Sequence, residues 1–114
     1  MIPEKVVYYD MDETLVLWNY EPTNEILNKL VTVDGTGLLP NESMIISMKR
    51  NKIRGFGIIL WTHSSMELAN KIVKALGLEK VVDLIIPKPV RYYDDRPVEE
   101  WIGVWIDSKK YTVK

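Results

Sequence analysis

Short apolar runs that end in polar side chains are the feature that most constrains how this chain can fold. The run Val6–Tyr9 ends at Asp10, and the run Ile58–Trp61 ends at Thr62. Runs of this length that are rich in β-branched and aromatic residues are typical of buried strands. The predicted strands are residues 5–10, 56–61, 81–86, 90–93 and 101–106.

Helical patterns separate these strands. Asn41 is a favourable N-cap and Gly55 a C-terminal stop for the helix predicted at residues 40–55. Ser64 and Glu67 form a capping box ahead of an apolar stripe, which Gly77 ends. The predicted helices are residues 22–31, 40–55 and 64–76.

The segment between the first strand and the helix at residues 40–55 carries turn signals. Residues 15–20 are apolar and aromatic, and we predict a flap or turn there. Asp34-Gly35 is a strong hairpin signal and predicts a tight turn within residues 32–39.

Strands that alternate with helices favour a parallel sheet covered on both faces. The predicted fold class is therefore α/β, a Rossmann-like three-layer α/β/α sandwich with a central, mostly parallel sheet. A chain of 114 residues, 46% of them hydrophobic, has the size and core content of a single domain. We expect residues 1–114 to form that one domain.

Composition excludes several classes of function. The chain has no cysteine, which rules out disulfides, thiolate metal sites and cysteine nucleophiles. A formal net charge of −1 gives no sign of an electrostatic nucleic-acid binder, although a local basic patch stays open. No signal peptide precedes the first strand and no apolar stretch is long enough to span a bilayer, so we expect a cytoplasmic protein with no membrane partner.

Polar side chains follow each of the first four predicted strands. They are Asp10 and Asp12, Thr62, Lys88, and the pair Asp94-Asp95. In an open parallel sheet the ligand crevice lies at the carboxyl ends of the strands. Separate segments therefore deliver charged and hydroxyl groups to one edge, which predicts a functional site there.

The carboxylates of Asp10 and Asp12 are two residues apart in the sequence, which is an unfavourable arrangement unless something offsets their charge. Side chains at positions i and i+2 of a strand point the same way, so both acids face one site. Two close carboxylates repel, and they usually share a cation or proton chemistry. One acid can attack as a nucleophile while the other moves protons. The alternative is a strand that runs into a polar, helix-capping loop.

These residues resemble the motifs of the haloacid dehalogenase superfamily, in the right order and over nearly the whole chain. Residues 10–14 resemble the first motif, Asp-x-Asp-x-Thr, with the Glu in fourth place that small CTD-type phosphatases carry. Thr62, Lys88 and Asp94-Asp95 match the second, third and fourth motifs. Residues 88–101 also resemble small phage-encoded members of the superfamily.

The resemblance implies a Mg²⁺-dependent phosphomonoester hydrolase, or phosphatase, that acts through an aspartyl-phosphate. Asp10 would attack phosphorus, and Asp12 would protonate the leaving oxygen and later deprotonate water. Thr62 would donate a hydrogen bond to a phosphoryl oxygen, and Lys88 would neutralise negative charge. Oxygen ligands suit Mg²⁺, which is the implied cofactor. The implied metal ligands are Asp10, Asp12 through its backbone carbonyl, and one or both of Asp94 and Asp95.

Each residue also has an ordinary structural explanation. Thr62 could cap the following helix, Lys88 could be an exposed lysine, and Asp94-Asp95 could lie in a solvated turn. For the whole chain, the alternatives are a catalytically weak binding module that keeps the fold, or a narrow nucleotide or nucleic-acid-end phosphatase.

The lengths between motifs leave no room for a separate cap domain. Lys88 follows the third strand almost at once, and residues 19–39 are too few for an independent domain. An open site suits a phosphorylated small molecule or a phosphorylated macromolecular end as the substrate. Trp18 could line the entrance, and His63 could touch substrate or only enter the next helix. The sequence leaves the substrate and the oligomeric state open.

Overall fold

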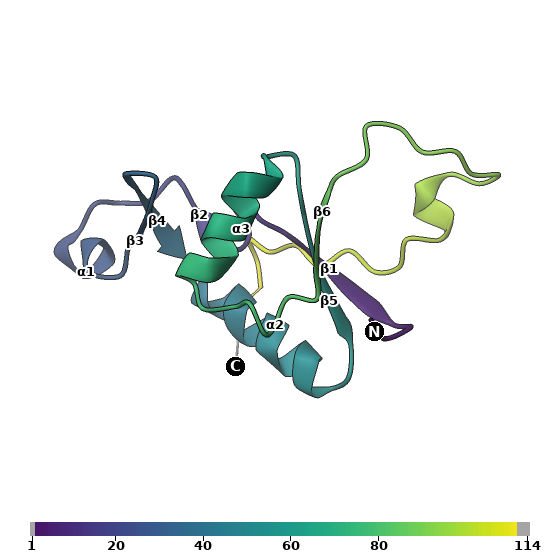
Figure 1. Cartoon of the computed structure of the whole chain (residues 1–114), viewed down its shortest axis with the longest axis horizontal. Coiled ribbons are helices and arrows are strands. Elements are labelled where there is room, and N and C mark those ends of the chain that lie inside the picture. Colours follow the sequence, from purple (N-terminus) through teal and green to yellow (C-terminus); the bar gives the residue numbers. More distant parts are fainter. Residues whose placement is uncertain (1, 112–114) are drawn as a thin grey trace.

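The computed structural model describes residues 2–111, which form a mixed α/β fold (Figure 1). The strands are β1 (Val6–Asp10), β2 (Val16–Leu17), β3 (Val31–Val33), β4 (Thr36–Pro40), β5 (Gly57–Thr62) and β6 (Leu84–Pro87). The helices are α1 (Asn24–Leu27), α2 (Glu42–Ile53) and α3 (Met66–Ala75), with a 3₁₀ turn, η1 (Val98–Glu100).

A three-stranded parallel sheet with the order β1-β5-β6 organises the fold. The central strand β5 pairs with β1 on one side and with β6 on the other, so its end at Thr62 lies between Asp10 and Lys88. The first three predicted strands and their parallel arrangement are confirmed. The third begins at Leu84 rather than Val81, because the Val81 and Val82 amides donate to the Leu78 carbonyl in a turn.

The core lies on one face of the parallel sheet, where α2 and α3 both pack, while Tyr8 and Leu84 on the other face are 46% and 42% exposed. Among the described residues, helices therefore do not cover both faces as predicted.

Ile58 and Leu60 of β5 have no exposed surface. Helix α2 contacts β5 and adds the fully buried Met48, while α3 contacts β6 and β3 and adds the fully buried Ile72. Met11, which follows β1, is also fully buried and ties the first strand's end to this core.

The two longer helices form where the sequence predicts them, but their N-termini are capped differently. Asn41 is at the N-cap of α2, yet its side-chain amide donates to the Thr14 carbonyl at 2.9 Å instead of capping the helix. The N-cap of α3 is Ser65, whose hydroxyl accepts from the Leu68 amide at 3.1 Å. The predicted capping box of Ser64 and Glu67 is therefore wrong by one residue.

A smaller antiparallel sheet, with the order β2-β4-β3, sits beside the parallel one. The predicted hairpin is confirmed, with Val33 opposite Thr36 and a two-residue turn at Asp34-Gly35. Asp34 and Gly35 have φ angles of 51° and 77°, which is the left-handed pair that a type I′ turn requires. The predicted flap contains β2, and the predicted helix at residues 22–31 is limited to α1.

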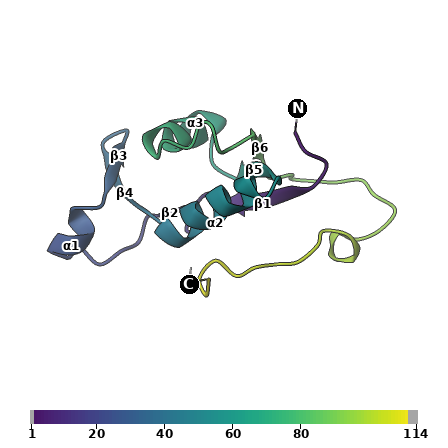
Figure 2. The same cartoon turned by 90° about the horizontal axis from the view of Figure 1, so that it is seen from below.

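The predicted strands at residues 90–93 and 101–106 are wrong. Residues 88–97 have no regular element, and the segment after η1 is irregular as well. Figures 1 and 2 show this stretch leaving β6 as a wide loop that extends away from α2 and α3. A strand needs a neighbouring backbone for its hydrogen bonds, and in the described part of the chain the loop has none beside it.

Candidate active site

An ion pair links the ends of the two outer strands of the parallel sheet. The Lys88 Nζ lies 3.2 Å from the Asp10 Oδ1, and the two side chains are 25% and 33% exposed. The Lys88 backbone amide donates to the Thr62 carbonyl at 2.9 Å, which extends the β5–β6 pairing by one residue. The Lys88 Nζ also lies 5.7 Å from the centre of the Trp61 ring, within the range of a cation–π contact. Lysine and acid are thus held together yet reachable from solvent.

Three side chains hold the second carboxylate. The Asp12 Oδ2 accepts hydrogen bonds from the Thr62 hydroxyl at 3.1 Å and from the Ser64 hydroxyl at 2.8 Å. The Asp12 Oδ1 accepts from the Trp18 Nε1 at 2.9 Å. Both carboxylate oxygens therefore have donors from separate segments of the chain, and the orientation of Asp12 is fixed.

Thr62 joins the strand end to this carboxylate. Its side chain is fully buried, and its hydroxyl donates to Asp12 while accepting from the Ser64 amide at 2.9 Å. The hydroxyl was expected to donate to a phosphoryl oxygen, but in this arrangement it is used to position Asp12. Thr62 does not cap the following helix, because Ser64 precedes α3 and the N-cap of α3 is Ser65.

The loop after β1 is held by its own side chains. Glu13 has a φ of 57°, and its Oε1 accepts from the backbone amides of Trp18 at 2.8 Å and of Asn19 at 3.2 Å. Leu15 and Val16 are fully buried. The loop is therefore anchored to the core and returns over the site.

The contacts of Glu13, Trp18 and Ser64 were not predicted from the sequence. Trp18 appeared only as a possible entrance residue, and Ser64 as a helix cap. A signal did exist for Trp18, because a buried indole N–H needs an acceptor and an acidic motif lies a few residues away.

The acidic pair of the last motif is not brought to this cluster. Asp94 and Asp95 are exposed in the loop after β6, where the Asp94 Oδ1 accepts from the Arg96 amide at 3.2 Å. Within residues 2–111, no three carboxylate or histidine side chains lie close enough together to bind a metal ion. His63 is exposed next to the cluster. The structure therefore unites Asp10, Asp12, Thr62 and Lys88, and leaves Asp94 and Asp95 apart.

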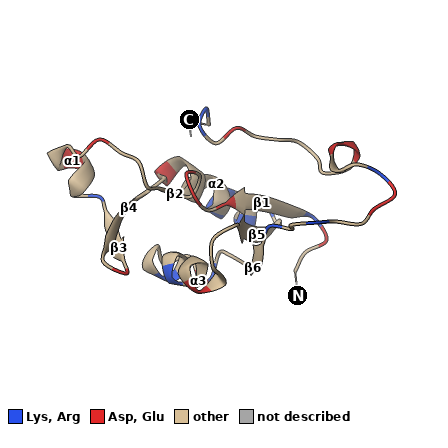
Figure 3. Cartoon of the chain, turned by 90° about the horizontal axis from the view of Figure 1, so that it is seen from above, with Lys and Arg blue, Asp and Glu red and all other residues tan. Residues whose placement is uncertain are grey.

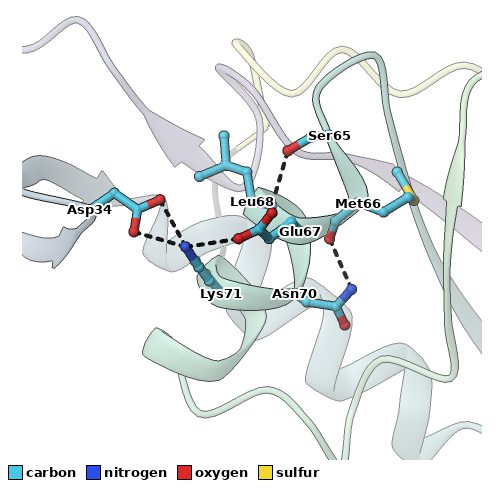
Figure 4. A network of polar contacts seen from close by, with 7 residues as sticks. All are labelled: Asp34, Ser65, Met66, Glu67, Leu68, Asn70 and Lys71. Carbon is cyan, nitrogen blue, oxygen red and sulfur yellow. Dashed lines mark hydrogen bonds and ion pairs between the residues drawn. The ribbon is translucent and has the colours of Figure 1, made fainter.

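Two ionisable groups with shifted pKa values lie outside this cluster. Burial raises the pKa of the Asp83 carboxyl, but hydrogen bonds from Lys52 and from the Ile58 amide outweigh burial and hold the pKa below its usual value. Hydrogen bonds to Asp34 and Glu67 raise the pKa of the exposed Lys71. Figure 4 shows Lys71 between these two acids, where it ties the hairpin turn to α3.

Charges of both signs are distributed over the chain (Figure 3), and the Asp10–Lys88 pair is partly exposed. Two surface depressions of about 290 and 330 Å³ lie beside α3, and neither is lined by Asp10, Asp12 or Lys88. Figure 3 shows basic and acidic residues distributed along the described ribbon, without a long stretch of one sign. No helix in residues 2–111 has the length and apolar character needed to cross a bilayer.

Comparison of the chain with protein-family models, with curated proteins and with solved structures finds no match. The resemblance to the haloacid dehalogenase superfamily rests on the motif residues themselves.

Proposed function

We propose that this protein is a phosphomonoester hydrolase of the haloacid dehalogenase type. The observation that carries the proposal is the contact between the Asp10 Oδ1 and the Lys88 Nζ at the strand ends, with both side chains partly exposed. A nucleophilic carboxylate needs access to substrate and a nearby cation to offset the charge of the phosphoryl group. Asp12, held two residues further on, supplies a second acid.

The proposed reaction has two displacement steps. In the first, an Asp10 oxygen forms a bond to phosphorus while the bond between phosphorus and the leaving oxygen breaks. Asp12 gives its proton to that leaving oxygen. In the second, Asp12 takes a proton from water, the water oxygen bonds to phosphorus, and the bond to Asp10 breaks. Inorganic phosphate leaves and both acids return to their starting forms.

Lys88 and Thr62 support these steps from neighbouring strands. The Lys88 ammonium offsets negative charge on Asp10 before attack and on the phosphoryl oxygens during it. Thr62 fixes the orientation of Asp12 through its buried hydroxyl. In the proposed single domain of residues 1–114, these groups share the carboxyl edge of the sheet.

Dependence on Mg²⁺ remains part of the proposal, but the described residues do not form a metal site in this arrangement. Asp10 would supply a carboxylate and Asp12 its backbone carbonyl, and no group of three carboxylate or histidine side chains forms among residues 2–111. We derive no step through the metal. Asp94 or Asp95 would have to approach the cluster to complete a set of oxygen ligands.

The open surroundings favour a phosphate that projects from its carrier. The Lys88 and Asp10 side chains are 25% and 33% exposed, and neither of the two depressions beside α3 includes them. A phosphorylated macromolecular end or a small phosphomonoester fits such a site. We propose hydrolysis of this substrate class as the activity.

A binding module is the second candidate. Large apolar side chains are exposed in the loop after β6, including Val90 at 99%, Tyr93 at 94% and Trp105 at 83%. Exposed apolar patches of this kind commonly mark interaction surfaces. A protein that kept the fold for contacts alone would bind through this loop and would need no chemistry at Asp10.

Hydrolysis of p-nitrophenyl phosphate with and without Mg²⁺ tests the proposal. We expect turnover that requires Mg²⁺, and a loss of at least about 100-fold in kcat for Asp10→Asn, because the amide cannot act as the nucleophile. Asp34→Asn is the matched control. It makes the same chemical change at the hairpin turn, where Asn-Gly suits the turn type, and should leave kcat unchanged.

Two results would count against the enzyme. Equal activity of the wild type and Asp10→Asn would remove Asp10 as the nucleophile. A folded wild type that shows no turnover, and whose Tm is not raised by Mg²⁺, would favour the binding module.

A further inference from the structure

Among the described residues, the Trp18 indole is the one donor to the Asp12 carboxylate that comes from the loop after β1. Its Nε1 lies 2.9 Å from the Asp12 Oδ1, while the other two donors, the Thr62 and Ser64 hydroxyls, are both on Oδ2. The indole ring is partly buried against the core. Without Trp18, Oδ1 would lose the only side-chain donor that the described residues give it.

The backbone around Trp18 is fixed independently of this contact. Its amide donates to the Glu13 Oε1 at 2.8 Å, and the Glu13 amide donates to the Val16 carbonyl at 2.8 Å. The adjoining strand β2 pairs with β4, with Leu17 opposite Leu39. Removing the indole N–H alone should therefore leave the loop in place, and its effect should be confined to Asp12.

The three donors differ in what they can do with a proton. A hydroxyl can turn and accept a hydrogen bond, whereas an indole N–H only donates. The Thr62 and Ser64 hydroxyls can therefore turn away from Oδ2, whereas the indole N–H is fixed by its ring and holds Oδ1 in place.

We propose that Trp18 is a positioning residue, which holds the Asp12 carboxylate in one orientation through the hydrogen bond from its Nε1 to Oδ1. The proposal rests on the proposed function, in which Asp12 acts as acid and base. It assigns a role in the reaction to the loop that follows the motif, where the sequence suggested only an entrance residue. A misplaced acid transfers its proton less well, so the loss should fall on turnover rather than on substrate binding.

The first test compares kcat and KM of Trp18→Phe with those of the wild type in the p-nitrophenyl phosphate assay. Phenylalanine keeps an aromatic ring and removes the N–H. We expect kcat to fall about 10- to 100-fold with KM little changed, because the Asp12 carboxylate is no longer held in one orientation. Trp105→Phe is the matched control, since Trp105 is 83% exposed and should keep wild-type kinetics. A Tm equal to the wild type would show that Trp18→Phe is folded.

The second test needs no activity. In a ¹⁵N–¹H spectrum of the whole chain, the indole N–H signal that is lost in Trp18→Phe belongs to Trp18. We expect Asp12→Ala to move this signal and to leave the Trp105 signal in place.

The outcomes separate the two proposals. Wild-type turnover with an unchanged kcat in Trp18→Phe would overturn the positioning role and leave the hydrolase intact. An indole signal that does not respond to Asp12→Ala would overturn the contact itself. A wild type that is inactive, but whose Trp18 signal does respond, would reject the hydrolase and the catalytic role while keeping the contact as a structural one.

Discussion

Strand β5 and the loop after β6 have similar side chains but differ in burial and in backbone structure. Ile58, Ile59 and Leu60 of β5 are 0–3% exposed, whereas Val104 and Trp105 of the loop are 90% and 83% exposed. Both segments are rich in β-branched and aromatic residues, which are favoured in strands. The difference lies in the neighbours, because β5 has a strand on each side and helix α2 against it. Apolar residues become a strand only where another backbone completes their hydrogen bonds.

The loop after β6 has hydrogen bonds and an aromatic contact within itself, although it pairs with no strand. The amides of Trp101 and Ile102 donate to the Val98 carbonyl, and the Val98 amide donates to the Tyr92 hydroxyl at 3.1 Å. The Tyr92 and Trp101 rings meet edge to face, with centroids 6.4 Å apart. This small cluster gives the loop local order without joining it to the core.

The largest effect should come from truncating the central strand. Leu60→Ala removes a fully buried side chain, and we expect it to cost about 2–5 kcal/mol of unfolding free energy through lost burial and an unfilled cavity. Urea unfolding followed by circular dichroism measures the change. A cost below about 1 kcal/mol would mean that β5 is not the centre of the core, and would break the contrast with the loop.

An intermediate effect should come from the ion pair between α2 and the start of β6. Asp83→Asn replaces a carboxylate that accepts from Lys52 and from the Ile58 amide, and we expect it to cost about 1.5–3 kcal/mol at pH 7. The pKa of Asp83 is lowered on folding, so its stabilisation is present above the usual aspartate pKa of about 3.9. It is lost as the pH falls through the folded value.

The stability difference between the wild type and Asp83→Asn should therefore shrink as the pH is lowered below about 4, because the Asp83 carboxylate is protonated and loses the charge that Asn never carries. Lys52→Met is the matched control, since it removes the cationic donor and should weaken this pH dependence. A difference that stays constant between pH 7 and pH 3 would contradict the assigned role of Asp83.

The smallest effect should come from the exposed loop. Trp105→Ala removes a larger side chain than Leu60→Ala does, yet we expect a change within about 0.5 kcal/mol, because the indole is 83% exposed. The same urea titration measures it. A loss of more than about 1 kcal/mol would show that Trp105 is covered in solution, and the loop would then belong with the core.

Much of the fold could be predicted from local patterns. The parallel strands, the Asp34-Gly35 turn and the two longer helices follow from runs, caps and turn residues that act over a few positions. The strands predicted at residues 90–93 and 101–106 failed because strand formation depends on a partner, which local composition does not specify. The cap of α3 was shifted because Ser64 contacts Asp12, and that contact spans the chain.

The residues of the candidate site also fall into two groups, those that local patterns predict and those whose contacts depend on distant parts of the chain. Asp10, Asp12, Thr62 and Lys88 were predicted together because the carboxyl ends of parallel strands share one edge. Trp18 and Ser64 were not assigned to Asp12, since their contacts depend on the path of a loop and on the first turn before a helix. Asp94 and Asp95 were expected at the same edge as the end of a strand, and without that strand nothing in the described residues brings them there.

The Lys88 amide donates to the Thr62 carbonyl, so the direction of the Lys88 side chain depends on the number of residues in β6. Side chains alternate between the two faces of a sheet, so one residue added to or removed from β6 would turn the Lys88 side chain away from Asp10. The same holds for β1 and β5, which set the places of Asp10 and Thr62. Substitutions on the surface of this protein should be tolerated far more readily than single-residue insertions or deletions in three short strands.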